Sequence, residues 1–290
     1  MKHFLSSACI VIVSLFGFTA CTLDNSVPLS TLKVDGRDRQ YYFYKPSKVQ
    51  AGAPLLIVLH GYGDNAYSIM KLKGFNPIAD RNNFAVCYPQ GSKDNKGVNF
   101  WNVGFIGHET ETVDDVHFIE TLVNKLVSEN NLDASRVFVT GESNGGFMCN
   151  MLATRKPHLF KAIAPVIGSM THKIYDSTAA AVPVPVMMIN GTSDVVVPWT
   201  GDPATDMLPV DTVFNFWSRT NTTTHLTIDT MPDLNKLENS IVVRYMKSDA
   251  DFKNPVWLYK VVNGGHVWPG FFTKKDFDAS EEIWNFFKNQ

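Results

Sequence analysis

The stretch VFVTGESNGGF, from Val137 to Phe147, consists of an apolar run followed by a serine set among glycines. The run VFVT predicts a strand, and the segment GGFMCNMLA predicts a helix. The motif G-x-S-x-G alone is weak evidence, because it arises by chance in roughly one in ten chains of this length. Its position at a strand-to-helix turn is informative, since small flanking residues let the backbone bend sharply and expose a hydroxyl. Ser143 is therefore a candidate nucleophile.

Apolar runs that do not alternate recur along the chain, as is typical of strands buried on both faces of a parallel sheet. They occupy residues 54–61, 83–91, 135–143, 160–168, 184–192 and 255–263. Helical patterns lie between them, at residues 113–131, 145–156, 211–220 and 278–289. A hairpin is expected around Asp35 and Gly36, before the first of these runs. The alternation predicts an α/β fold, with a mostly parallel sheet and helices on both faces.

Composition narrows the functional classes. The chain has 290 residues and a formal net charge of −2, with no long basic run, so no nucleic-acid partner is expected. No dinucleotide or Walker fingerprint occurs, so no cofactor is predicted. Neither internal repeats nor linkers divide the sequence, and we expect one catalytic domain from residue 22 to residue 290, acting as a monomer.

The first 21 residues resemble a bacterial lipoprotein signal. Lys2 precedes an apolar run from Phe4 to Ala20, and GFTAC resembles a lipobox that ends at Cys21. About 17 apolar residues lie at the short limit for a membrane span. The resemblance implies lipidation of Cys21, export, and membrane contact through that lipid only. Thr22 stands where an aspartate would retain such a lipoprotein at the inner membrane, so the resemblance implies the outer membrane. The alternative is an ordinary signal peptide, which would give a periplasmic or extracellular protein.

Two further cysteines, Cys87 and Cys149, lie in the apolar contexts FAVCYPQ and GGFMCNMLA. Export would permit a disulfide between them. Cysteine is nevertheless among the residue types most often buried, so two buried free thiols are the preferred interpretation.

A serine nucleophile needs a base, and the base needs an acid that orients it. In an α/β fold with a nucleophile at such a strand-to-helix turn, the chain order is serine, acid, histidine. His266 follows the strand-like run VWLYKVV on a glycine-rich loop, whereas the other histidines after Ser143 lie at a helix end or in polar segments. Asp194 follows the buried run MMING in a similar position. Ser143, Asp194 and His266 are therefore predicted to form a catalytic triad.

Two backbone N–H groups are candidates for the oxyanion hole, which stabilises the charge of a tetrahedral intermediate. Asn144 follows the nucleophile directly, and Tyr62 lies in LHGYGDN at the end of the first parallel strand. Trp199 and Trp268, each just after a triad loop, are predicted to bind substrate, although tryptophans are mostly core residues.

No metal site is predicted. The adjacent acids Asp114 and Asp115 stand at a helix start, where capping and the helix dipole suffice to explain them.

Seven blocks in order resemble the polyhydroxybutyrate depolymerase and feruloyl esterase family of α/β-hydrolases, over nearly all the chain from about residue 30. They are LIVLHGYGDN, YPQG, FWN, VDDVHFIETLV, TGESNGGFMCNMLA, NGTSDVVVPWTG and NGGHVWPG. The resemblance implies an exported serine esterase with the triad and oxyanion residues named above. Glu142 and His117 depart from the family pattern, and an anion at position 142 would disfavour a nearby oxyanion.

The predicted reaction is hydrolysis of carboxylic esters through an acyl-enzyme. Candidate substrates are short hydroxyalkanoate oligomers and feruloyl or acetyl esters of polysaccharide. An acyltransferase and a non-catalytic binding lipoprotein on the same fold remain alternatives, because one fold supports many functions.

Overall fold

The computed structural model describes residues 27–176, 181–237, 239–270 and 276–290. The predicted signal segment and its Cys21 lie outside the described residues. Within the described part of the chain, no helix is both long and apolar enough to cross a membrane.

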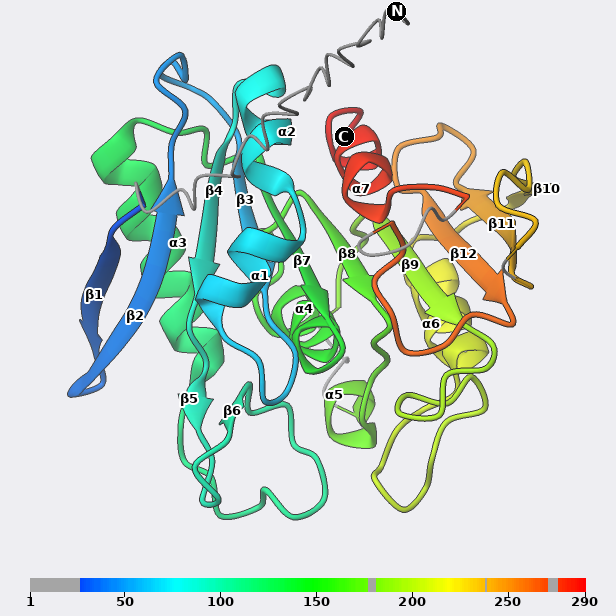
Figure 1. Cartoon of the computed structure of the whole chain (residues 1–290), viewed down its shortest axis with the longest axis horizontal. Coiled ribbons are helices and arrows are strands. Elements are labelled where there is room, and N and C mark those ends of the chain that lie inside the picture. The colour runs from blue at the N-terminus through cyan, green and yellow to red at the C-terminus, as the bar shows by residue number, and fades with distance from the viewer. Residues whose placement is uncertain (1–26, 177–180, 238, 271–275) are drawn as a thin grey trace, which may run out of the picture.

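A ten-stranded sheet forms the centre of the molecule, in the order β1-β2-β4-β3-β7-β8-β9-β12-β11-β10 (Figure 1). The six strands from β4 to β12 in that order are parallel, and antiparallel pairs close both edges. The strands are β1 (Leu29–Val34), β2 (Arg37–Tyr44), β3 (Leu55–Leu59), β4 (Ala85–Pro89), β7 (Val137–Glu142), β8 (Ala162–Val166), β9 (Val186–Gly191), β10 (His225–Thr230), β11 (Ile241–Ser248) and β12 (Val256–Val262). A separate two-stranded ribbon pairs β5 (Ser92–Lys93) with β6 (Asn99–Phe100).

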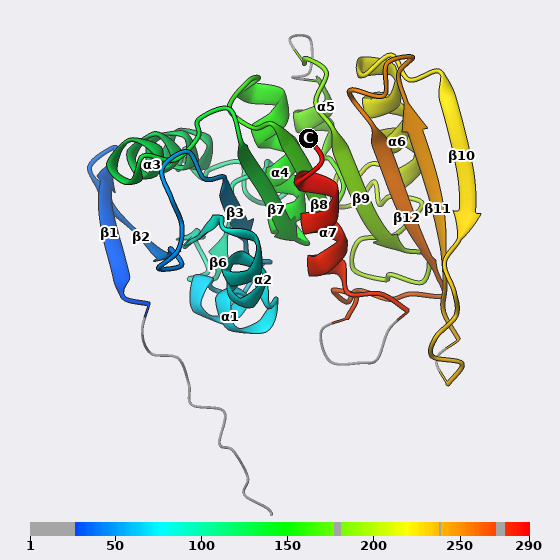
Figure 2. The same ribbon diagram turned by 90° about the horizontal axis from the view of Figure 1, so that it is seen from above.

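Helices cover both faces of the sheet, as Figure 2 shows from above. Helices α3, α4 and α6 lie on one face, and α1, α2 and α7 lie on the other. The helices are α1 (Ala66–Leu72), α2 (Phe75–Asn82), α3 (Asp115–Asn130), α4 (Asn144–Arg155), α5 (His172–Asp176), α6 (Val210–Thr220) and α7 (Ala279–Phe287). This architecture is the predicted α/β-hydrolase-like fold.

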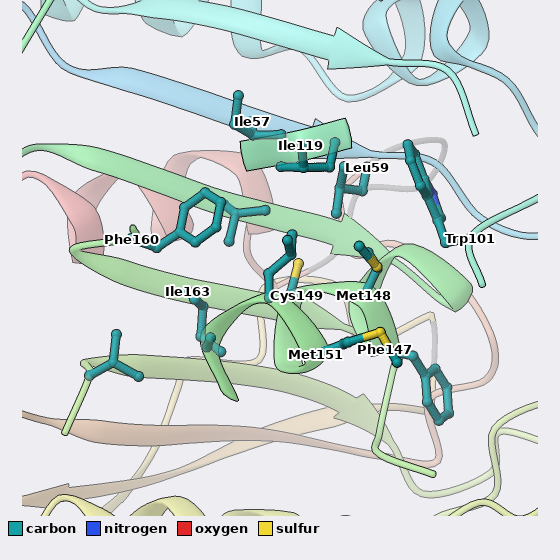
Figure 3. Packing of buried hydrophobic residues seen from close by; sticks show 14 of the residues in the cluster. Ile57, Leu59, Trp101, Ile119, Phe147, Met148, Cys149, Met151, Phe160 and Ile163 are labelled. Atoms are coloured by element: carbon teal, nitrogen blue, oxygen red, sulfur yellow. The ribbon is translucent and has the colours of Figure 1, made fainter. Parts of the chain in front are cut away.

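Strand β3 shows why the apolar runs do not alternate. Leu55, Ile57 and Leu59 point into the core under α3 and α4, while Leu56 and Val58 point into the core under α1, α2 and α7. Successive side chains of a strand face opposite sides, so a strand with helices on both sides must be apolar throughout. Figure 3 shows the first of these two cores, where Ile57 and Leu59 lie beside residues of α3 and α4.

The predicted hairpin, the six parallel strands and the four helices are all present. Short or edge elements were not predicted as such: α1, α2, α5, the β5–β6 ribbon and the antiparallel pair β10–β11. Cys87 and Cys149 are buried free thiols, which confirms the preferred interpretation, and burial raises the pKa of each well above its usual range.

Candidate active site

Ser143 lies at a sharp turn between β7 and α4. Its backbone has φ 54° and ψ −117°, a conformation that L-residues rarely adopt and that costs on the order of 1–3 kcal/mol. The flanking glycines make the turn possible. A Cβ on Gly141 would lie 2.6 Å from the Gly145 backbone, and one on Gly145 would lie 2.5 Å from the carbonyl oxygen of Leu59. The strand, turn and helix therefore pack too closely for any larger residue at these two positions.

Asp194 and His266 are brought together although 72 residues separate them. Nδ1 of His266 lies 2.7 Å from Oδ2 of Asp194, and this carboxylate is almost wholly buried. Its other oxygen accepts the backbone N–H groups of Val196 and Val197, both at 2.8 Å. An ionised carboxylate only accepts hydrogen bonds, so Nδ1 carries the proton and Nε2 is the nitrogen left with a lone pair.

The three predicted triad residues follow three parallel strands of one sheet. Ser143 follows β7, Asp194 comes after β9, and His266 comes after β12. All three therefore lie at the carboxyl edge of the sheet, where open α/β sheets bind ligands. Among the described residues, no hydrogen bond joins the Ser143 hydroxyl to His266. Catalytic hydrogen bonds are often long in the absence of substrate.

Two backbone donors are available beside Ser143. A Cβ on Gly61 would lie 3.5 Å from Cβ of Ser143, so the turn after β3 touches the serine. Neither the Tyr62 N–H nor the Asn144 N–H donates a hydrogen bond to another described residue. The Asn144 N–H is the first of α4, where no partner exists within the helix. Both N–H groups therefore remain candidate donors for an oxygen atom bound at Ser143.

The side chain of Asn144 is occupied elsewhere. Its Oδ1 accepts the backbone N–H of Trp101 at 2.6 Å, and its Nδ2 donates to the Trp101 carbonyl at 3.0 Å. The indole Nε1 of Trp101 in turn donates to the carbonyl of His60 at 2.9 Å. Trp101 is fully buried and thus links the start of α4 to the turn that carries Tyr62.

His60 is a site residue that the sequence analysis missed. Its ring is fully buried, with Nδ1 2.8 Å from the carbonyl oxygen of Gly61 and Nε2 accepting the Gly91 N–H at 2.9 Å. Burial lowers the pKa of His60 to about 4. His60 stands within LHGYGDN, but nothing in the sequence pattern indicated where its imidazole points.

Glu142, the anion that departs from the family pattern, has a cationic partner. Nζ of Lys73 lies 2.9 Å from Oε2 and 3.0 Å from Oε1 of Glu142, and the lysine side chain is only 5% exposed. The same ammonium group lies 5.2 Å from the centre of the Trp268 ring. The negative charge beside the nucleophile is therefore balanced by a buried lysine.

The two tryptophans predicted to bind substrate lie in different surroundings. Trp268 is 2% exposed; its ring packs edge-on against Phe75 and its Nε1 donates to Ser280. Trp268 therefore packs in the core, which was the alternative interpretation for this residue. Trp199 is half-buried, and its Nε1 donates to Asp211 at 3.0 Å.

Exposed apolar side chains adjoin the triad. Val195 follows Asp194 and is 88% exposed, and Val267 follows His266 and is 49% exposed. Tyr62 is 44% exposed, and its hydroxyl donates to Asp94 at 2.6 Å. Neither valine was predicted to lie at the site, because an isolated valine carries no sequence pattern.

The paired acids at the start of α3 are explained by structure. Asp114 caps the helix by accepting the N–H of His117, and Asp115 is buried against Arg39 at 2.6 Å. No cluster of three metal-binding side chains occurs in the described parts of the chain.

A surface hollow of about 930 Å³ lies far from these residues. Pro54 and Arg136, which precede β3 and β7, line it together with Trp284 of α7. It therefore opens at the amino edge of the parallel strands, opposite the predicted triad, and takes no part in the candidate site.

Comparison with solved structures places this fold among esterases. Acetyl xylan esterase from Aspergillus awamori superposes with a TM-score of 0.62 over 91% of this chain and 100% of that one, at 14% identity. Esterase PE8 superposes with a TM-score of 0.55 over 91% and 99% of the two chains, at 16% identity. At such low identity the likeness concerns the fold alone.

Curated relatives match part of the sequence. Poly(3-hydroxyalkanoate) depolymerase C of Paucimonas lemoignei is 33% identical over 132 residues, covering 44% of this chain and 31% of that protein. Feruloyl esterase B of Neurospora crassa is 34% identical over 143 residues, covering 49% and 48%. The chain thus spans less than half the length of either relative.

The model of the family described as esterase PHB depolymerase matches residues 40–207, which is more than half of the chain. The matched range includes Ser143 and Asp194 as well as Tyr62 and Asn144, and it ends before His266. The chain therefore belongs to the esterase PHB depolymerase family.

Proposed function

We propose that the protein is a carboxylic ester hydrolase that works through an acyl-enzyme on Ser143. The observation that carries the proposal is the 2.7 Å contact between buried Asp194 and His266, on loops at the same edge of the sheet as the strained Ser143 turn. A buried carboxylate that orients an imidazole toward a serine is the arrangement that activates a hydroxyl nucleophile, and Ser143 is half-buried.

In the first half of the reaction, Nε2 of His266 takes the proton of the Ser143 hydroxyl while Oγ attacks the ester carbonyl. The N–H groups of Tyr62 and Asn144 donate to the resulting oxyanion. The imidazolium, stabilised by Asp194, then gives its proton to the leaving alcohol. Water attacks the acyl-enzyme in the same manner, the acid leaves, and Ser143 recovers its proton.

Short hydroxyalkanoate oligomers and feruloyl or acetyl esters of polysaccharide are the proposed substrates. The names of the relatives support these classes, since they include a depolymerase of poly(3-hydroxyalkanoate), feruloyl esterases and acetylxylan esterases. Exposed Val195, Val267 and Tyr62 offer apolar contact to an acyl or aromatic group near the triad.

We also propose that the protein is exported and anchored by a lipid on Cys21. The sequence GFTAC after an apolar run supports this location. In a Cys21→Ala variant the protein would then move from the membrane fraction to the soluble fraction. Retention of the variant in membranes would contradict lipidation at Cys21.

A panel of soluble esters tests the activity: a hydroxybutyrate oligomer, methyl ferulate, an acetylated xylo-oligosaccharide and a p-nitrophenyl ester. Wild-type protein should hydrolyse at least one of them, and Ser143→Ala, compared at equal folded concentration, should not. Hydrolysis by Ser143→Ala above a tenth of the wild-type rate would refute the nucleophile assignment.

A further inference from the structure

Strand β10 forms one edge of the ten-stranded sheet, and in the described parts of the chain no strand lies beside its outer side (Figures 1 and 2). Its side chains are largely exposed on both faces. Two of them are large and apolar: Leu226 is 51% exposed and Ile228 is 54% exposed. An edge strand of this kind presents a row of unpaired N–H and C=O groups, which can pair with a strand of another chain.

The register with β11 shows which backbone groups of β10 point outward. The pairing runs without a break over all six residues of β10. Just beyond them the Met231 N–H donates to the Val242 carbonyl, so residue 231 directs its backbone groups toward β11. In an antiparallel ladder this direction alternates along the strand, so residues 226, 228 and 230 direct their N–H and C=O groups outward. These outward groups bond to no described residue.

Strand β10 lacks the features that usually protect a sheet edge. Natural edges are blunted by lysine, proline, a bulge or an inward-pointing charge. The sequence of β10, HLTIDT, contains neither lysine nor proline, and its register has no bulge. Its one acid, Asp229, is bonded through both carboxylate oxygens to Arg244 of β11, at 2.6 and 2.5 Å. The charge on this edge is therefore already balanced within the sheet.

The sequence of β10 is complementary to its own reverse. Two copies related by a two-fold axis at Thr227 would pair antiparallel, with Leu226 of each copy opposite Ile228 of the other. Both residues direct their backbone groups outward, so each such pair would exchange two main-chain hydrogen bonds. Opposite residues point to the same face of a sheet, so the four apolar side chains would pack together. On the other face, His225 would stand opposite the carboxylate of Asp229.

A shifted register is less complementary. With the axis at Ile228, Leu226 would stand opposite Thr230, and Asp229 would stand opposite Thr227. Such a pair would match apolar side chains with polar ones and would lose the contact between the imidazole and the carboxylate. The register centred on Thr227 is therefore the one that the side chains favour.

The face that carries Leu226 and Ile228 continues the core under α6. Ile228 lies opposite Tyr245 of β11, and Tyr245 packs against that core. Leu226 lies opposite Lys247, whose Nζ is 4.9 Å from the centre of the Phe214 ring of α6. In one copy of the chain this apolar face ends at two half-exposed side chains. A second copy paired along β10 would cover them.

We propose that the protein forms a two-fold symmetric dimer through β10, in which the two ten-stranded sheets join into one continuous sheet. A monomer was expected from the sequence, in which β10 was not recognised as a strand. Antiparallel pairing reverses the strand direction, so the carboxyl edges of the two sheets would face opposite ways and both candidate active sites would stay open. The inference is independent of the proposed esterase function.

A cysteine at the two-fold axis tests the register. Exposed Thr227 would face Thr227 of the second copy at a non-hydrogen-bonded position, where Cα atoms lie about 4.5 Å apart. A disulfide can span that separation. Under mild oxidation Thr227→Cys should therefore give several-fold more disulfide-linked dimer on non-reducing gels than Ser128→Cys, which places an exposed cysteine on α3. Wild type, in which Cys87 and Cys149 are buried, gives the background.

A charge at the centre of the edge tests the interface itself. Light scattering should give wild type about twice the mass of one chain, since paired edges are what lysine prevents. Ile228→Lys should have the mass of one chain, and in the Thr227→Cys background it should remove the excess cross-linking. Ile228→Val is the matched control and should remain dimeric. Both Ile228 variants should keep the wild-type melting temperature and rate of ester hydrolysis per chain, because this side chain is exposed and lies away from the triad loops.

Three results would overturn the inference: cross-linking of Thr227→Cys no greater than that of Ser128→Cys, cross-linking that Ile228→Lys leaves unchanged, or a single-chain mass for wild type at the highest concentration measured. None of these results bears on catalysis. Absence of ester hydrolysis in a dimeric wild type, in contrast, would refute the proposed function and leave the dimer in place.

Discussion

Asp194 accepts three hydrogen bonds at once: from His266 through one oxygen and from the backbone N–H groups of Val196 and Val197 through the other. The backbone bonds fix the carboxylate independently of the histidine. The orientation of the imidazole is therefore a consequence of how the loop after β9 folds.

This arrangement makes Asp194→Asn a selective test. The Asn Oδ1 can still accept the two backbone N–H groups, but its amide then presents a donor to His266. The imidazole would have to place its proton on Nε2, where it cannot act as a base. We expect kcat to fall by about 10⁴-fold with little loss of stability. Asp202→Asn, on the same loop but bonded to Thr205, is the matched control and should retain activity. An active Asp194→Asn enzyme would contradict the assignment of the acid.

Backbone strain at Ser143 predicts an unusual order of stabilities. At φ 54° and ψ −117°, glycine is relieved of strain that alanine retains. The free energy of unfolding of Ser143→Gly should therefore exceed that of Ser143→Ala by about 1 kcal/mol, so the glycine variant is the more stable one. Both variants should be inactive. The control is Ser128, exposed in α3, where alanine should be more stable than glycine by about 1 kcal/mol. The same order at both sites, measured by urea unfolding, would argue against strain at the turn.

The Lys73–Glu142 pair should affect the reaction through charge. Replacing Lys73 with Met leaves the Glu142 carboxylate without this cation beside the developing oxyanion. We expect kcat to fall roughly 10-fold, a charge interaction of about 1.4 kcal/mol. Adding Glu142→Gln to that variant removes the anion and should recover most of the rate. A double variant as slow as Lys73→Met alone would show that the lysine acts by packing.

Stability should depend on pH through His60. Its pKa is lowered from 6.5 to about 4 in the folded protein. Between these values the unfolded chain takes up a proton that the folded protein does not, so acidification favours unfolding. The stability that the folded protein gains by keeping His60 neutral is fully present above pH 6.5. This part of the free energy of unfolding falls by about 3 kcal/mol as the pH approaches 4.

His60→Gln removes this titration, so its unfolding free energy should decline less between pH 6.5 and 4.5 than that of wild type. His225→Gln, which replaces an exposed histidine on β10, should keep the wild-type slope. Identical slopes for His60→Gln and wild type in urea unfolding at several pH values would contradict the neutral, buried state of His60.

The features of the fold and the site that were predicted from the sequence are those that depend on a local residue pattern. The parallel strands were recognised from runs that must be apolar on both faces, and Ser143 from small residues at a strand-to-helix turn. Chain order and position after buried strands also selected Asp194 and His266. The edge pair β10–β11 was missed because β10 is largely exposed, β11 is mostly half-buried, and neither strand is a continuous apolar run.

Contacts that join distant segments had no sequence signal. The pairing of Glu142 with Lys73, 69 residues away, depends on where the end of α1 places Lys73 relative to the end of β7. The burial of Trp268 depends on Phe75 and α7, although its position after His266 suggested a place at the site.

Covalent labelling tests the central claim, that Ser143 is the nucleophile of an esterase, most directly. A fluorophosphonate transfers its phosphonyl group to an activated serine oxygen with loss of fluoride, and peptide mass spectrometry locates the adduct. We predict one adduct, on Ser143, formed in proportion to the loss of ester hydrolysis and formed much more slowly in Asp194→Asn. An adduct on another residue that accounts for the lost activity, or full hydrolysis by protein labelled at Ser143, would contradict the account.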